Sequence, residues 1–175
     1  DKHFGYESAT GVALASGEHL TNLAYLAVNK LGSPYGSQWL INATTGTWQY
    51  KFNEPRVIKS ARLMSSNTIN RLPRRFTIDG AFASAPSTWV TVNSDYSAAD
   101  YPENGVYLFS DLIDMSANTV AYDYYQINVT ANHGDASFMG FAEIELNTIT
   151  PSDYYNVVDG LVYNNAGTVI DRVYL

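Results

Sequence analysis

The sequence predicts an all-β protein, an antiparallel β-sandwich of the jelly-roll type. Short runs alternate apolar and polar residues with a period of two, and Asn, Gly, Ser and Pro fill the gaps between them. Helix signals are scarce. Seven or more short strands spaced in this way are typical of a sandwich, whereas a parallel sheet would alternate strands with helices.

The clearest strand covers residues 47–52, where Trp48, Tyr50 and Phe52 share one face and Pro55 follows as a break. The one helical candidate is a single turn at 23–29. Further strands are expected over residues 57–63, 75–78, 88–92, 106–109, 122–129 and 138–146.

After Pro151 the strand pattern starts again. Residues 157–163 and 168–175 flank a turn that contains Gly167, and together they predict a β-hairpin. This piece is too short to bury a core of its own. We therefore expect residues 1–148 to form one domain, and residues 149–175 to be a linker and the first hairpin of a following domain. The chain opens without an initiator Met or a signal-peptide pattern, which indicates a part of a longer protein.

Composition and charge exclude several functions. A net charge of −7 disfavours nucleic acid, whose phosphates need clustered Lys and Arg. No apolar stretch approaches the roughly 20 residues needed to cross a bilayer, so we expect no membrane insertion. The chain has no cysteine, and the three histidines, at positions 3, 19 and 133, lack metal-ligand spacing. No serine stands in a nucleophile-elbow context, so we expect no enzyme.

Several motifs follow one another in an order known from one family. They include Ala24-Tyr25-Leu26-Ala27-Val28-Asn29, Trp39, Trp48-Gln49-Tyr50-Lys51-Phe52, Pro73-Arg74-Arg75-Phe76-Thr77-Ile78, Trp89 and Ala142-Glu143-Ile144-Glu145-Leu146. In this order, from about residue 6 to 148, the chain resembles discoidin-like domains, also called coagulation factor V/VIII type C domains. The resemblance implies a jelly-roll sandwich that binds a cell-surface glycan without catalysis.

A second resemblance concerns the setting of the protein. Tyr6-Glu7-Ser8, residues 127–132 and residues 159–173 are similar to modules of bacteriophage tail fibres and receptor-binding proteins. This implies a virion tail fibre, or another extracellular or cell-surface location. The implied partners are other virion or adhesin subunits, and the chain would form homo-oligomers through its parent protein.

The family resemblance also implies a structural calcium ion. In discoidin-like domains the first Glu of the closing motif binds this ion beside the early loop, which here points to Glu143 and Asn29. Oxygen ligands suit such a hard cation, and Asn in place of the usual Asp predicts weaker binding. In the alternative interpretation Glu143 and Glu145, two apart on a strand, form a solvated outer face.

Sugar binding needs planar side chains that stack on pyranose rings and polar groups that hold hydroxyls, carried on loops at one end of the sandwich. Three loops qualify in the sequence. The candidate residues are Trp39 on the first loop, Asn67, Asn70 and Arg71 on the second, and His133, Asp135 and Phe138 on the third. Trp39 either stacks on a sugar or packs beneath its loop, and Arg71 either grips hydroxyls or forms a surface salt bridge.

Three functions therefore compete. The first is a glycan-binding adhesion module, which the aromatic and polar loop residues favour. The second is a structural or protein-interaction module of a virion or cell-surface assembly that touches no sugar. The third is a hydrolase, which the missing acid/base spacing disfavours.

Overall fold

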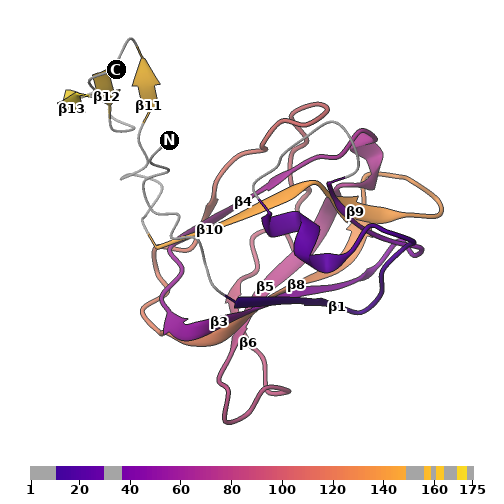
Figure 1. Cartoon of the computed structure of the whole chain (residues 1–175), viewed down its shortest axis with the longest axis horizontal. Coiled ribbons are helices and arrows are strands. Elements are labelled where there is room, and N and C mark those ends of the chain that lie inside the picture. The colour runs from indigo at the N-terminus through magenta and orange to yellow at the C-terminus, as the bar shows by residue number, and fades with distance from the viewer. Residues whose placement is uncertain (1–10, 30–36, 149–155, 159–160, 164–168, 173–175) are drawn as a thin grey trace.

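Two antiparallel sheets enclose one hydrophobic core in the computed structural model of the chain (Figure 1). The structure describes residues 11–29, 37–148, 156–158, 161–163 and 169–172. The larger sheet has the order β1 (Gly11–Ala15), β3 (Gly46–Arg56), β8 (Tyr122–Asn132), β5 (Pro73–Ala81) and β6 (Val90–Asn93). The smaller has the order β10 (Glu143–Asn147), β4 (Ser60–Met64) and β7 (Ile113–Asp114). The predicted sandwich is confirmed.

Alternation along the strands fills the core. On β3, Trp48, Tyr50 and Phe52 are all buried, because each successive side chain of a strand points to the opposite face. Ile78 and Ile127 of the same sheet are also buried in this core, and Leu63 and Ile144 join it from the smaller sheet. These are the apolar contacts that hold the two sheets together.

A short ladder of β2 (Trp39–Ile41) and β9 (Met139–Phe141) closes one side of the core. The ring of Phe141 makes edge contacts with both Trp39 and Trp48, at centroid distances of 5.2 and 5.8 Å. Gly140 permits the pairing, because a Cβ at this position would collide with the carbonyl oxygen of Trp39. The ladder fixes where the segment before β9 lies.

In the residues that the structure describes, helical structure is limited to two short 3-10 turns, η1 (Ala24–Val28) and η2 (Ile69–Arg71). The first confirms the turn expected at 23–29. No helix in the described part of the chain has the length and apolarity needed to cross a membrane.

One predicted strand is wrong. Residues 106–109 form a loop, and Tyr107 in its middle has a φ of 54°, which is incompatible with a strand. Only an isolated bridge between Phe109 and Met64 remains. The strand expected over 138–146 is interrupted at Ala142, which separates β9 from β10, and the alternation did not predict β1 or β2.

The alternative interpretation of Glu143 and Glu145, as a solvated outer face of a strand, is wrong, because both side chains on β10 are buried. Glu143 and Glu145 are only 5% and 7% exposed. Glu145 accepts two hydrogen bonds from the guanidinium of its cross-strand neighbour Arg62, which in turn lies 4.1 Å from the centroid of the Phe109 ring. The loop that replaces the expected strand therefore supplies the ring that lies against this ion pair.

The C-terminal part contains β11 (Asn156–Val158), β12 (Leu161–Tyr163) and β13 (Val169–Arg172), which pair in this order as an antiparallel sheet. The single strand expected over 157–163 is thus two strands. The predicted pairing across residues 164–167 is confirmed, although these residues themselves lie outside the described ones. A domain boundary at 148 stays a prediction.

Candidate functional site

Two of the three predicted loops lie side by side at the start of β5. The β4–β5 loop contains η2, and the β8–β9 loop spans residues 133–138. The register of β5 with β8 pairs Pro73 with Asn132, which brings the two loops together. Backbone hydrogen bonds then join them: the Asp135 N–H donates to the Asn70 carbonyl, and the His133 N–H donates to that of Leu72, both at 3.1 Å.

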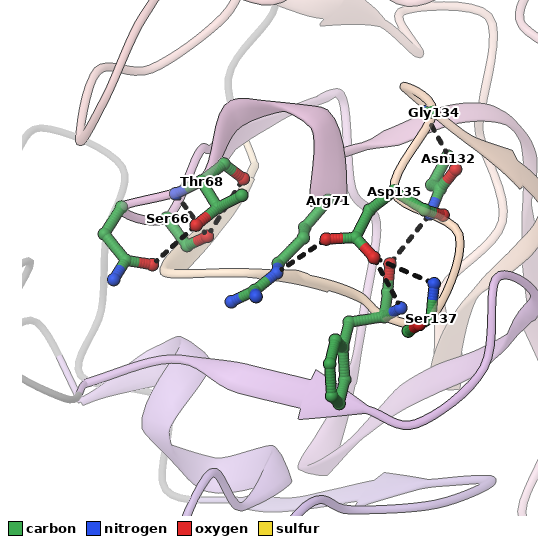
Figure 2. Close-up of polar contacts among 9 residues, drawn as sticks. Ser66, Thr68, Arg71, Asn132, Gly134, Asp135 and Ser137 are labelled. Carbon is green, nitrogen blue, oxygen red and sulfur yellow. Dashed lines mark hydrogen bonds and ion pairs between the residues drawn. The ribbon is translucent and has the colours of Figure 1, made fainter.

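An ion pair between Arg71 and Asp135 forms the centre of this site (Figure 2). Arg71 Nε donates to Asp135 Oδ2 at 3.0 Å, while Asp135 Oδ1 accepts from the backbone N–H groups of Ser137 and Phe138, each at 2.9 Å. These two N–H groups first, and then the guanidinium of Arg71, hold the pKa of Asp135 below its usual range. The carboxylate is therefore ionised at neutral pH.

The side chain of Asn132 shapes the same loop from within. Its Nδ2 donates to the carbonyls of Asp135 and Phe138, at 2.8 and 2.7 Å. Its Oδ1 accepts from the N–H of Gly134, whose φ of 113° only glycine adopts readily. Asp135 is thus presented to Arg71 by a loop with internal support (Figure 2).

Arg71 keeps donors to spare. Within residues 11–29 and 37–148, no hydrogen-bond partner is found for its two terminal nitrogens. In Figure 2 these nitrogens point away from Asp135, on the side where Ser66 and Thr68 lie. The guanidinium carbon is 5.0 Å from the centroid of the Phe138 ring. A planar ring beside free, charge-assisted donors can bind a polyhydroxylated ligand.

His133 and Asn67 border the site in different ways. His133 Nε2 lies 2.8 Å from the backbone oxygen of Tyr101. Since a carbonyl only accepts, Nε2 carries the proton, and the ring braces the loop against a fully buried tyrosine. Asn67 is exposed, and its Oδ1 accepts from the Thr68 hydroxyl at 3.3 Å.

The structure corrects the predicted role of Trp39 as a sugar-binding residue. Its side chain is fully buried, and Nε1 donates to the carbonyl of Gly17 at 2.9 Å. The ring is therefore core, as in the second interpretation, and offers no face to a sugar. Because β2 and β9 are antiparallel, Ser37 and Gln38 lie at the end of β9 that is far from Phe138. The described end of the first loop, Ser37 and Gln38, thus lies away from Arg71 and Phe138.

His19 is a neighbour that sequence reasoning missed. Its ring makes an edge contact with Phe138 at a centroid distance of 4.9 Å. The position is fixed by the His19 N–H, which donates to the carbonyl of Leu40 in β2 at 2.8 Å. No local sequence signal links these residues, since they meet through the hydrogen bond of His19 to β2 and the pairing of β2 with β9. Below, "the Arg71 site" means Asn70, Arg71, Asp135, Phe138 and His19.

Asn29 and Glu143 lie in another part of the fold, where η1 packs against β10. Asn29 ends η1, and its Oδ1 accepts a hydrogen bond from the Ser37 hydroxyl at 2.8 Å. Among the described residues no group of three or more His, Asp or Glu side chains could hold a metal ion. A hard cation prefers oxygen ligands, and this region offers the amide oxygen of Asn29, the backbone carbonyl of Leu26 and the buried carboxylate of Glu143. Only one of these three ligands is charged, which predicts weak binding.

Comparison with known proteins identifies the fold. No protein-family model matches the chain, and no curated protein sequence matches it. Solved structures do. An F5/8 type C domain from Bacteroides fragilis has 14% identity and a TM-score of 0.65, over 83% of this chain and 95% of that one. The family 32 carbohydrate-binding module of Clostridium perfringens NanJ, solved in complex with galactose, has 14% identity and a TM-score of 0.61, over 78% and 92%.

Another family 32 module from Clostridium perfringens, solved in complex with GalNAc-β-1,3-galactose, has 12% identity and a TM-score of 0.61, over 77% of this chain and 92% of that one. At these identities the likeness concerns the fold. The chain has the β-sandwich of discoidin-like domains, as the order of its motifs predicted.

Proposed function

We propose that this chain, which has the fold of discoidin-like domains, is a non-catalytic carbohydrate-binding module that holds a cell-surface glycan at the Arg71 site. Similar structures carry galactose and a GalNAc-containing disaccharide, so the fold is one on which sugars bind. In the described residues, the two loops offer the hydrogen-bond donors of Arg71 and the ring of Phe138, which can hold a sugar.

The observation that carries the proposal is that Asp135 engages only one of the three guanidinium nitrogens of Arg71. Asp135 engages Nε and fixes the plane of the group, while the terminal nitrogens retain their N–H donors. Two parallel donors on a rigid fork match a pair of vicinal hydroxyls, and the adjacent Phe138 ring can pack on the C–H face of a pyranose. Arg71 thus combines the two alternatives of the sequence analysis, since it forms a salt bridge and still offers donors.

We also propose the setting and the cofactor that the resemblance implies. The setting is a phage tail fibre or another extracellular receptor-binding protein, with other virion or adhesin subunits as partners and oligomerisation through the parent chain. Its support is the sequence resemblance of Tyr6-Glu7-Ser8, residues 127–132 and residues 159–173 to such modules. The cofactor is a structural calcium ion held by Asn29 and Glu143, whose support is the oxygen ligands at the η1–β10 contact.

Arg71→Ala tests the binding site. On a glycan array with galactose-, N-acetylgalactosamine- and fucose-terminated glycans, the wild-type domain should bind at least one class, and the variant should lose that signal. Hydrogen bonds from a charged group contribute about 1.5–3 kcal/mol, so the affinity for the hit should fall more than tenfold.

Arg56→Ala is the matched control, because Arg56 lies at the opposite end of β8, next to Tyr122. It removes the same charge and should bind like the wild type, and melting curves of both variants should show folded protein. Equal loss of binding in both variants would contradict the proposed site. A folded wild type that binds no glycan would instead favour the structural or protein-interaction module.

A further inference from the structure

Asn132, the last residue of β8, is buried and uses its whole amide group inside the protein. Nδ2 donates one proton to the Asp135 carbonyl and one to the Phe138 carbonyl, while Oδ1 accepts from the Gly134 N–H (Figure 2). An amide nitrogen carries two protons, so no donor is left over for a ligand. Any effect of Asn132 on sugar binding must therefore act through other residues.

The two carbonyls that Asn132 holds are the two ends of one short segment, residues 135–138. Its amide nitrogen bridges these ends at 2.8 and 2.7 Å, and so closes the segment from the side of β8. The backbone hydrogen bonds to Asn70 and Leu72 fix only residues 133 and 135. For residues 136–138, the hydrogen bonds found are those that the side chains of Asn132 and Asp135 make. The path of this segment therefore depends on these two side chains.

The closed segment aims the carboxylate of Asp135. Ser137 and Phe138 both donate their N–H groups to Oδ1, which leaves Oδ2 for Arg71 Nε. The two N–H groups converge on one oxygen only while the chain folds back from residue 138 toward residue 135. Asn132 holds the chain in this shape, because it binds the carbonyls at both ends. The orientation of the Arg71 guanidinium thus depends directly on Asp135 and indirectly on Asn132.

We infer that Asn132 is a positioning residue of the Arg71 site, which holds Asp135 in the place from which it orients the Arg71 guanidinium. The inference rests on the proposed function, because it concerns the affinity for the sugar that Arg71 holds. A loop that is already ordered in the free protein does not have to be ordered on binding, which raises the affinity. Loss of the Asn132 amide should therefore weaken binding, although Asn132 contacts no sugar.

Asn132→Ala tests this role through two readouts. Amide chemical-shift titration with the tightest-binding glycan from the array should show an affinity about tenfold below that of the wild type, a usual size for coupling within one hydrogen-bond network. A 13C NMR titration of the Asp135 carboxyl group should show its pKa rising toward about 3.9, the value of an unfolded chain, because the N–H groups of Ser137 and Phe138 no longer converge on it. A residue that only stabilises the fold would change neither.

Asn93→Ala is the matched control, because Asn93 is a buried asparagine that ends a strand, β6, in the same way. Its Nδ2 donates to Asp95 Oδ2 at 2.8 Å and to the Asp114 carbonyl at 3.0 Å, and its Oδ1 accepts from the Asp95 N–H at 3.2 Å. The two variants remove the same group at similar burial and should lose similar stability. Asn93→Ala should leave the affinity for the glycan and the pKa of Asp135 unchanged.

Gly134→Ala is a second variant, which tests the loop if Asn132→Ala does not fold. A Cβ at Gly134 would meet no non-neighbouring atom within 4 Å, so the substitution only disfavours the φ of 113° at which Gly134 donates to Asn132. It should lower the affinity for the glycan and raise the pKa of Asp135, as Asn132→Ala does.

Three outcomes would overturn the positioning role. They are wild-type affinity in folded Asn132→Ala, an unchanged pKa of Asp135 in that variant, and an equal loss of affinity in Asn93→Ala. If Arg71→Ala lowers the affinity in the same experiment, the proposed function stands and only the role of Asn132 is wrong. A wild type that binds no glycan would overturn both.

Discussion

At the scale of single residues, Tyr125 shows how much of the sandwich depends on one hydroxyl. The group lies between the segment after β3 and the segment before β8. It accepts from the Ile58 N–H at 3.1 Å and from Asn118 Nδ2 at 3.0 Å, and it donates to the Arg56 carbonyl at 2.8 Å. A tyrosine oxygen has one proton and two lone pairs, so its capacity is filled. Burial raises the pKa of Tyr125, which keeps the hydroxyl protonated.

Tyr125→Phe should therefore destabilise the domain. The ring still fills its place in the core, but two buried donors and one acceptor lose their partner, which costs about 1–3 kcal/mol in the free energy of unfolding. Urea denaturation measures this difference. Tyr124→Phe is the control, because Tyr124 is the neighbouring, partly exposed residue on the other face of β8, and it should change stability by less than about 0.5 kcal/mol. Equal effects of the two variants would contradict this account.

Trp39 and His19 show which residues of a site a sequence can reveal. A tryptophan near a predicted loop fits either a sugar platform or a core residue, and only the packing against Phe141 decides between them. Arg71, Asp135 and Phe138 were predicted as separate loop residues, and the β5–β8 register brings them together. His19 gave no signal, because its contact with Phe138 depends on strand pairing distant in sequence.

At the scale of elements, the strands with regular alternation were predictable and the loops were not. β3, β5 and β8 lie where the pattern placed them, since one buried face enforces the period of two. The alternation of Val106 and Leu108 misled, because both side chains are exposed on a loop with a left-handed Tyr107. The burial of Glu145 was likewise hidden, because it depends on Arg62 across the strand and on Phe109 beside it.

The β8–β9 loop should respond to pH through Asp135. Its pKa in the folded state is lowered by the N–H groups of Ser137 and Phe138 and by Arg71, relative to about 3.9 in an unfolded chain. The carboxylate therefore stabilises the folded state above that value, and this contribution is lost as the pH falls through the folded pKa. The difference in unfolding free energy between wild type and Asp135→Asn should be constant from pH 8 to 5.

Below about pH 4 the same difference should shrink, because the wild-type carboxyl then takes up a proton. Urea denaturation of both proteins at pH 7, 5 and 3 provides the measurement. Comparison with the variant cancels the contributions of the ionisable groups that both proteins share. A difference that grows toward acid pH would show that Asp135 is not stabilised as an anion.

The η1–β10 contact is where the proposed calcium ion should act. An ion that binds only the folded chain stabilises it by mass action, by about 2.7 kcal/mol at a concentration one hundred times its Kd. EDTA should therefore lower the melting temperature, and added calcium should restore it. Glu143→Gln should remove the response, whereas Glu54→Gln, at an exposed position of β3, should keep it. A melting temperature that EDTA does not change would leave Asn29 and Glu143 as structural residues only.

At the scale of the whole molecule, the net charge of the chain and the ion pair at the Arg71 site both favour a neutral ligand. The chain carries a net charge of −7, which repels anionic glycans over about one Debye length, some 8 Å at physiological salt. At the site itself Asp135 balances the charge of Arg71. Recognition should thus depend on hydroxyl geometry and ring packing, as for a neutral hexose.

Amide chemical-shift mapping tests the central claim, that the paired loops around Arg71 bind the sugar. The 15N-labelled domain is titrated with the tightest-binding glycan from the array, and with the same glycan after the Arg71→Ala substitution. The account predicts saturable shifts confined to residues 66–72, 132–138 and 18–22, which disappear in the variant. Saturable shifts on the exposed face of the larger sheet, or shifts that persist without the Arg71 side chain, would contradict it.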